Sequence, residues 1–192
     1  GALAGLGAVI FRWLLATATD LIWPGSGSFA DQYQQAGLFL RLGVPLAAGL
    51  LLGPVLARLA PETRGPGVPE VMAALALRDG IIRHRVTAVK SLATALFIAA
   101  GCSVGREGPI VQIGASIGSS LTQLFRLGPE HRRLAVACGA AAGIAATFQA
   151  PMAGTMFAVE ILLFDLEIGL LSNIVVAAVT GTVVARLCWS RE

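Results

Sequence analysis

Charged residues divide this chain into long apolar segments, and their spacing limits the possible folds. Uncharged runs cover residues 42–57, 91–105, 108–125, 134–159 and 168–185. A further apolar segment, residues 1–23, carries only Arg12 and Asp20. A helix that crosses a bilayer needs about 20 apolar residues. Several runs are shorter or contain Gly and Pro, so we expect half-helices, which lie at membrane depth only inside protein or beside a water-filled cavity.

The composition favours a lipid environment over water. The 192 residues are 56% hydrophobic and 13% charged, whereas soluble domains are about one quarter charged. The mean hydropathy is +0.78, and a 19.7 kDa globule could not hide so many apolar side chains. We therefore predict that residues 1–192 form a single all-α, polytopic membrane domain with broken and tilted helices. Because the chain begins inside an apolar run, we expect it to be a fragment.

The excess of basic residues, a net charge of +3, is typical of cytoplasmic loops in a membrane protein. Two groups lie between apolar runs, and we interpret both as charges of loops and helix ends. Their members are Arg78, Arg83, Arg85 and Lys90, then Arg126, Arg132 and Arg133. No motif that reads RNA or DNA is present, so nucleic acid is not an expected partner. Residues 25–35 are polar and turn-like and are predicted to form a loop.

Catalytic and metal-binding patterns are absent from the sequence. Three widely spaced cysteines, Cys102, Cys138 and Cys188, make neither a disulfide framework nor a metal site. Both histidines, His84 and His131, stand beside arginines, which argues against zinc. We find no Ser/His pairing, no His-Glu-x-x-His and no P-loop, and we expect no enzyme activity, metal or cofactor.

Three positions combine a small residue with a proline that opens an apolar run. They are GPGVPE at 65–70, GREGP at 105–109 and FQAP at 148–151. Proline is favoured in the first turn of a helix, and a preceding glycine lets a ligand approach bare amides. That turn leaves up to four N–H groups unpaired and carries about half a positive charge, so a small anion is its natural partner within a membrane. We expect the starts marked by Pro69 and Pro109 to meet at one hydrated cavity.

The pair Arg106 and Glu107 separates uncharged runs of 15 and 18 residues. If both runs lie in the membrane, the charge pair between them lies in the membrane as well. Charges in contact with lipid are costly, so the pair indicates that this segment lines an aqueous path. The alternative is a mutual ion pair at a helix end near the surface. The spacings Gly114–Gly118 and Gly139–Gly143 are most simply faces on which helices pack closely.

At these residues the chain resembles the CLC family of chloride channels and chloride/proton exchangers. Residues 105–118 resemble the GREGP signature and its helix, 65–70 the GSGIPE motif, and 139–160 the next conserved block. The resemblance covers nearly the whole chain but only the first of the family's two inverted halves. An anion path built by this chain alone is therefore expected to be incomplete, and a truncated, non-conducting subunit stays an alternative.

The resemblance implies an anion channel or transporter whose gate is Glu107, a tethered carboxylate that can occupy the anion site in place of chloride. It assigns anion binding to two segments: Pro66, Gly67, Val68 and Pro69, then Gly105, Arg106, Gly108, Pro109 and Ile110. It also implies that the full-length protein is a multi-pass homodimer in the cell membrane. The expected partners are the lipid bilayer and chloride or another small monovalent anion.

Two departures from the family pattern matter. Pro66 replaces the serine of GSGIPE and supplies neither hydroxyl nor N–H to the anion, which leaves the choice between chloride and nitrate open. Family members that favour nitrate carry Pro there and fluoride exporters usually Met, but Pro66 could also be a neutral turn variant. Exchangers carry two successive glutamates that align with Glu160 and Ile161. Since isoleucine carries no proton, strict antiport is in doubt unless another acid, such as Asp165 or Glu167, substitutes.

Overall fold

The computed structural model describes residues 1–23, 29–59, 67–163 and 168–189, which form helices and no strand. The long helices are α1 (Ala2–Ile22), α3 (Leu38–Leu59), α5 (His84–Ala99), α6 (Glu107–Leu124), α7 (Pro129–Phe148) and α9 (Ile168–Trp189). The short ones are α2 (Phe29–Gln35), α4 (Val68–Leu77) and α8 (Pro151–Phe157), which continues into a π-helical segment, η2 (Ala158–Leu163). The predicted all-α class and broken helices are confirmed.

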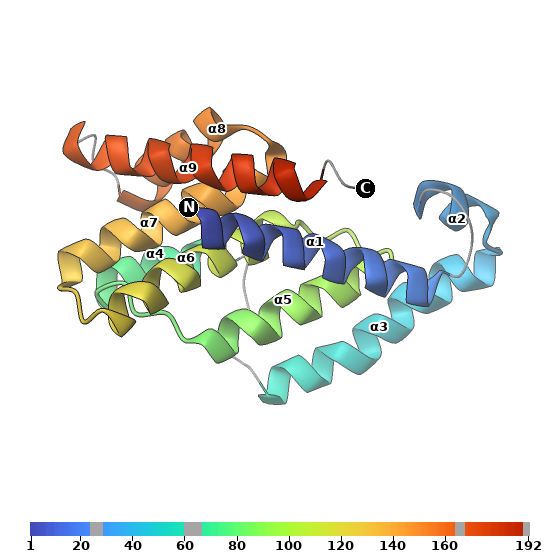
Figure 1. Ribbon diagram of the computed structural model, residues 1–192. Helices are drawn as coiled ribbons and strands as arrows, with labels where there is room; N and C mark the ends of the chain where they lie inside the picture. The colour runs from blue at the N-terminus through green and yellow to red at the C-terminus, as the bar shows by residue number, and fades with distance from the viewer. Residues whose placement is uncertain (24–28, 60–66, 164–167, 190–192) are drawn as a thin grey trace.

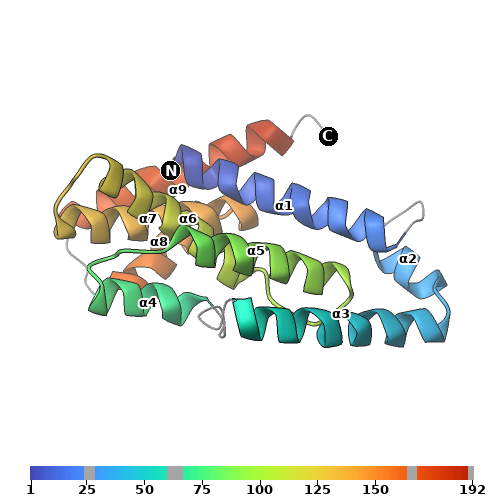
Figure 2. The same ribbon diagram turned by 90° about the horizontal axis from the view of Figure 1, so that it is seen from below.

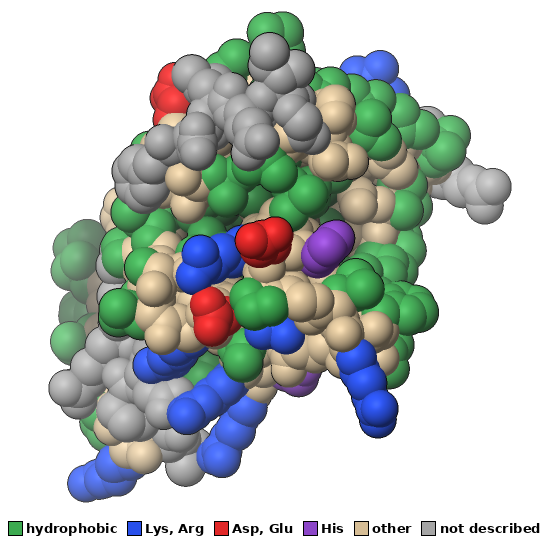
Figure 3. All heavy atoms as spheres, turned by 90° about the vertical axis from the view of Figure 1, so that its left-hand side faces the viewer, with side chains coloured by type: hydrophobic (Ala, Val, Ile, Leu, Met, Phe, Trp, Pro, Cys, Tyr) green, Lys and Arg blue, Asp and Glu red, His purple; other side chains and the backbone are tan. Residues whose placement is uncertain are grey.

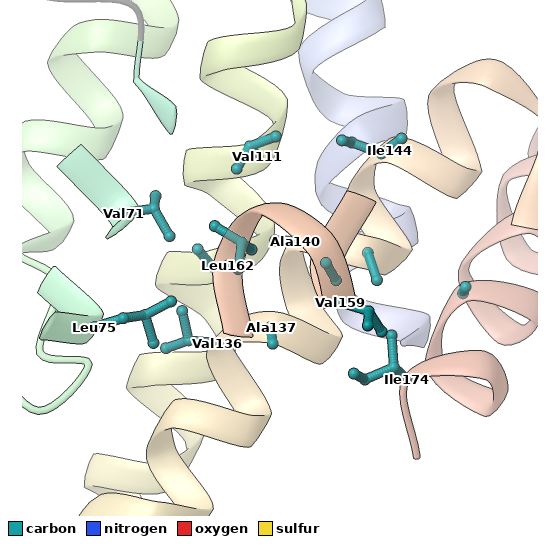
Figure 4. Packing of buried hydrophobic residues seen from close by; sticks show 14 of the residues in the cluster. Val71, Leu75, Val111, Val136, Ala137, Ala140, Ile144, Val159, Leu162 and Ile174 are labelled. Carbon is teal, nitrogen blue, oxygen red and sulfur yellow. The ribbon is translucent and has the colours of Figure 1, made fainter. Parts of the chain in front are cut away.

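Helix α7 occupies the centre of the molecule and packs against α1, α6, α8 and α9 (Figure 1). Its buried face is made almost entirely of small residues, and Ala137, Ala140 and Ala145 are fully buried. Val136 and Ala137 meet Val71 of α4, Val111 of α6 and the η2 residues in one apolar cluster (Figure 4). Within the described residues, three helices, α1, α3 and α9, contain stretches long and apolar enough to cross a membrane.

Glycines let α6 and α7 cross with their backbones in contact. A Cβ atom added to Gly114 would collide with the carbonyl oxygen of Gly139, and one added to Gly139 would collide with that of Gly114. One turn along, a Cβ on Gly118 would collide with the Ala135 oxygen. The predicted packing role of these small residues is confirmed. No side chain longer than hydrogen fits at the crossing.

Gly139→Ala is therefore expected to lower the free energy of unfolding by about 1–3 kcal/mol, the usual effect of overpacking a close contact. The matched control is Gly49→Ala on α3, where nothing lies within 4 Å of an added Cβ atom. Thermal unfolding of both variants in detergent measures the difference. Equal transition temperatures for the two would contradict the close crossing.

The longest uncharged run, 134–159, does not form one helix. Helix α7 ends at Phe148, and the next residue, Gln149, has a left-handed backbone (φ 55°, ψ 31°) that reverses the chain. Pro151 then opens α8, as expected for a residue whose missing N–H is unpaired in a first turn. The composition of this run predicts a membrane-embedded segment, but the left-handed Gln149 and the helix-starting Pro151 divide it into two helices.

The prediction of a loop over 25–35 is wrong for its second part, since α2 covers Phe29–Gln35. Residues 25–28 of the predicted loop lie outside the described residues. Phe29 and Tyr33, four residues apart, pack their rings on Trp23, with centroids 6.3 and 5.5 Å away. Trp23 is buried and donates a 2.8 Å hydrogen bond from Nε1 to the Ala99 carbonyl oxygen. Aromatic packing against α1 and α5 thus outweighs the polar composition of the segment.

Arginines of the two basic groups lie close together at one end of the bundle, and Figure 3 shows several Lys and Arg side chains on that face. Arg133 forms a 2.9 Å ion pair with Asp79, and Arg132 donates to the Asp79 carbonyl oxygen at 3.4 Å. These contacts join the α6–α7 side to the loop between α4 and α5. We refer to this end, which carries Arg78, Arg83 and Arg85 as well, as the basic end.

Lys90 corrects the prediction that its whole group consists of loop and helix-end charges. It is the seventh residue of α5, its side chain is only 7% exposed, and its Nζ lies 3.2 Å from Glu70 Oε2. Because the helix begins at His84, Lys90 lies in its interior and not at its end. The Lys90 side chain points toward Glu70 of α4. Glu70 supplies the opposite charge that a buried ammonium group needs.

Candidate functional site

The starts of α4 and α6 touch through two glycines. Gly67 precedes α4 and has φ 93° and ψ −46°. Glycine adopts this conformation readily because it has no Cβ atom. A Cβ atom at Gly67 would lie 2.9 Å from the carbonyl carbon and oxygen of Gly108. The structure therefore brings together two motifs that are about 40 residues apart in the chain. We call this contact the glycine junction.

The first turn of α6 presents an electropositive end at this junction. Gly108, Pro109 and Ile110 are buried, whereas Arg106 and Glu107 are exposed. No side chain caps the helix at Arg106. Early amides of a helix have no acceptor one turn back, and the helix dipole adds partial positive charge. Such a start can hold a small anion without a full counter-charge.

The carboxylate of Glu107 is folded back over the preceding loop. A Cβ atom at Gly105 would collide with Glu107 Oε2, so the glycine leaves the space that the carboxylate occupies. The acid and the first-turn amides therefore belong to the same helix start. An anionic side chain in the first turn is electrostatically favourable, and a dissolved anion would compete with it for the same field.

The third proline-marked start lies beside the second. The Arg106 guanidinium is 5.3 Å from the centroid of the Phe148 ring, a cation–π contact with the end of α7. Arg106 also lines a pocket with Arg12 of α1 and Thr147 of α7. The structure thus places two arginines on one pocket beside the start of α6. The alternative of a mutual Arg106–Glu107 ion pair finds no support, since no such pair occurs among the described residues.

The segment that aligns with the exchangers' paired glutamates is the π-helical η2. Glu160 is exposed, and Ile161 is 37% exposed. Their neighbours Val159 and Leu162 lie in the buried apolar cluster, Leu162 beside Val71 and Leu75 of α4 and Val159 near Ile174 of α9 (Figure 4). The structure therefore places Ile161 on a distorted helix, a feature often found at functional sites. Pro66, Asp165 and Glu167 lie outside the described residues.

Two polar features escaped the sequence reasoning. Gln112 on α6 is 1% exposed, and neither of its amide atoms has a hydrogen-bond partner in the described chain. His84 Nδ1 lies 3.1 Å from the Ser120 hydroxyl and 3.4 Å from that of Ser116. The Ser116 and Ser120 hydroxyls, one helical turn apart, were the available signal. The Ser120 hydroxyl already donates to the Ser116 carbonyl oxygen, so it is positioned as an acceptor toward His84.

The described residues were also searched for a metal site and for disulfides. No group of three or more His, Cys, Asp or Glu side chains there could hold a metal ion. Cys102, Cys138 and Cys188 carry free thiols. The candidate site is therefore the glycine junction with Glu107 and Arg106, whose residues belong to the GPGVPE and GREGP motifs.

Comparison with known proteins links this arrangement to one family. Residues 48–192 match the family model described as voltage gated chloride channel. The chain is 37% identical over 177 residues to the voltage-gated ClC-type chloride channel ClcB of Yersinia pseudotuberculosis, covering 92% of this chain and 41% of the relative. It is 37% identical over 178 residues to the H(+)/Cl(-) exchange transporter ClcA of Yersinia pestis, covering 90% and 34%. The chain thus spans about two fifths of the length of these relatives.

The fold agrees with that assignment. A crystal structure of a slow cyanobacterial Cl-/H+ antiporter superposes with a TM-score of 0.75 at 26% identity, over 97% of this chain and 44% of the antiporter. With the family model covering about three quarters of the residues, the chain is a membrane protein of the CLC family.

Proposed function

We propose that the full-length protein moves chloride, or another small monovalent anion, across the membrane past Glu107. The observation that carries the proposal is the glycine junction, where two helix starts meet beside an acid and an arginine. The chain supplies one wall of the path, and the remaining length found in the relatives supplies the other. The names of the relatives, a chloride channel and a chloride/proton exchanger, agree with this substrate class.

Glu107 acts as the gate in this proposal. Its carboxylate is an anion tethered to the helix start that attracts chloride. When the carboxylate is ionised it competes with chloride for the first-turn amides, and when it is protonated it leaves them. Arg106 raises the local anion concentration at the mouth, because one uncompensated charge favours anions within a Debye length of about 8–10 Å.

Anion selectivity depends on what lines the inner approach. Gly67, Val68 and Pro69 bring backbone to the path, while Pro66 offers no donor. A site that lacks a hydroxyl donor discriminates less in favour of chloride, so we propose that nitrate also passes. Transport requires no cofactor, metal or nucleic acid, and as a family member the full-length protein would work as a homodimer with no enzymatic step.

The direct test is Glu107→Gln in full-length protein reconstituted into liposomes. We expect the variant to release trapped chloride at a different rate from the parent and to lose most of the pH dependence of release, since glutamine cannot titrate. Chloride-selective electrodes follow the release over a series of pH values, with nitrate as a second anion.

Glu130→Gln is the matched control, because Glu130 also lies in the first turn of a helix but at the basic end. This control should behave as the parent does. Unchanged rate and pH dependence in Glu107→Gln would contradict the gate, and absence of chloride release from the parent would contradict the proposed function altogether.

A further inference from the structure

Two loops at the basic end expose large apolar side chains next to arginines. Leu77 ends α4 and is 82% exposed, and the exposed Arg78 follows it. Just beyond α6, Phe125 and Leu127 are 68% and 42% exposed and stand on either side of the exposed Arg126. Figure 3 shows hydrophobic and basic side chains next to one another on this face. We call these five residues the loop surface.

A single guanidinium holds the two loops together. Arg132 donates from one terminal nitrogen to the Asp79 carbonyl oxygen at 3.4 Å, and from the other to the Leu127 carbonyl oxygen at 3.3 Å. The first loop is also tied to α6, because the Ser119 hydroxyl donates to the Gly80 carbonyl oxygen at 2.6 Å. The two parts of the loop surface therefore have a fixed relation to each other.

The charge of the loop surface is available to a molecule outside the chain. Arg78 and Arg126 form no ion pair within the described residues. Asp79 lies between the loops, but its carboxylate is already bound to Arg133 at 2.9 Å. A guanidinium presents paired N–H donors that match the oxygens of a phosphate group, so phosphate is its natural partner.

Arg126 occupies a position that suits glycine better. Its φ is 52°, in the left-handed region just after the end of α6. Helices commonly end with glycine in this conformation, because a Cβ atom is strained there. The chain nevertheless places an arginine at this point, between two exposed apolar side chains. Replacing it by glycine would remove the charge and relieve the strain together.

The apolar members of the loop surface point to lipid as the partner. A charge signal that orients a membrane protein needs basic residues alone. Phe125 and Leu127 add exposed apolar area, which a polyanion such as nucleic acid would leave in water. At the boundary between headgroups and acyl chains, apolar side chains enter the acyl region while basic side chains meet phosphate. The mixture of the two kinds on one surface matches that boundary.

We propose that the loop surface binds anionic phospholipids of the leaflet that faces the basic end. Arg78 and Arg126 pair with the charged headgroups, and Leu77, Phe125 and Leu127 contact the acyl chains. This role goes beyond anion transport and does not depend on it. One basic residue near an anionic surface strengthens binding by about fivefold, so two arginines should favour phosphatidylglycerol over zwitterionic phosphatidylcholine by roughly 25-fold.

The experiment titrates full-length protein in neutral detergent with phosphatidylglycerol and, separately, with phosphatidylcholine. The rise in unfolding temperature gives an apparent affinity for each lipid. Arg126→Gly should lower the preference for phosphatidylglycerol about fivefold without lowering the unfolding temperature of the lipid-free protein. Phe125→Ser should weaken the binding of both lipids and leave their ratio unchanged.

Arg186→Gln is the matched control, because Arg186 contacts Gln149 at the opposite end of α7. It should keep the lipid preference of the parent. Equal affinity of the parent for the two lipids would overturn the inference, and so would an unchanged preference in Arg126→Gly. Glycerol 3-phosphate, which lacks acyl chains, should not displace phosphatidylglycerol. Displacement at equal concentration would contradict lipid binding and show a site for free anions. None of these measurements uses chloride release, so failure of the proposed function would leave them unchanged.

Discussion

Gly67→Ala in the full-length protein is expected to reduce chloride release by about tenfold or more while leaving the protein folded. The residue has φ 93°, where a side chain is strained by about 1–3 kcal/mol. Its new methyl group would also lie 2.9 Å from the Gly108 backbone, which has no flexible side chain that can move aside. The start of α4 must therefore shift away from α6. Each 1.4 kcal/mol of lost anion binding is a tenfold change in affinity.

The control for this prediction separates strain from contact. Gly80 also has a positive φ, 76°, but an added Cβ there meets its nearest atom at an ordinary 3.4 Å, in the Arg132 side chain. Gly80→Ala should lower the unfolding temperature and leave chloride release per folded molecule near that of the parent. Equal losses of release in the two variants would show that backbone strain, and not the glycine junction, is responsible.

The second large effect concerns protons. Chloride flow through the parent protein is expected to move few protons and to show no fixed proton-to-chloride ratio, since Ile161 cannot accept a proton. Ile161→Glu should create measurable proton movement that follows the chloride gradient. The position is 37% exposed on η2, so a carboxylate there can remain hydrated. Parallel recordings with pH and chloride electrodes on liposomes measure both fluxes.

A nearby exposed residue provides the comparison for Ile161→Glu. Met156 on α8 is 44% exposed, and Met156→Glu adds the same charge at another apolar position. It should not produce proton movement. A constant proton-to-chloride ratio in the parent would contradict the argument from Ile161 and would direct attention to another internal acid.

The fold class and the positions of the helix starts were readable from local patterns. Uncharged runs indicated helices in a membrane, and α4, α6 and α8 begin at the three proline-marked motifs as predicted. These features depend on neighbours within a few residues. A proline in a first turn or a glycine before it has the same effect wherever the segment lies in space.

Predictions from local sequence patterns failed where contacts between distant segments determine the structure. The polar composition of 25–35 indicated a loop, but rings that lie close to Trp23 hold Phe29–Gln35 in a helix. Lys90 read as a surface charge because nothing in its neighbourhood along the chain reveals Glu70, twenty residues earlier. Gln112 lies in an uncharged run, and nothing in the sequence around it predicts that its side-chain amide is buried.

Sequence patterns alone therefore define the long helical segments of this protein, where three helices start, and which acid stands at the second start. The tertiary structure decides that Gly67 touches Gly108, that Arg106 meets Phe148, and that Lys90 is neutralised by Glu70. The physical reason is range. Helix starts follow from backbone geometry over one turn. A contact between two helix starts and a buried ion pair instead require distant segments to pack closely, and that depends on the volumes of all the side chains between them.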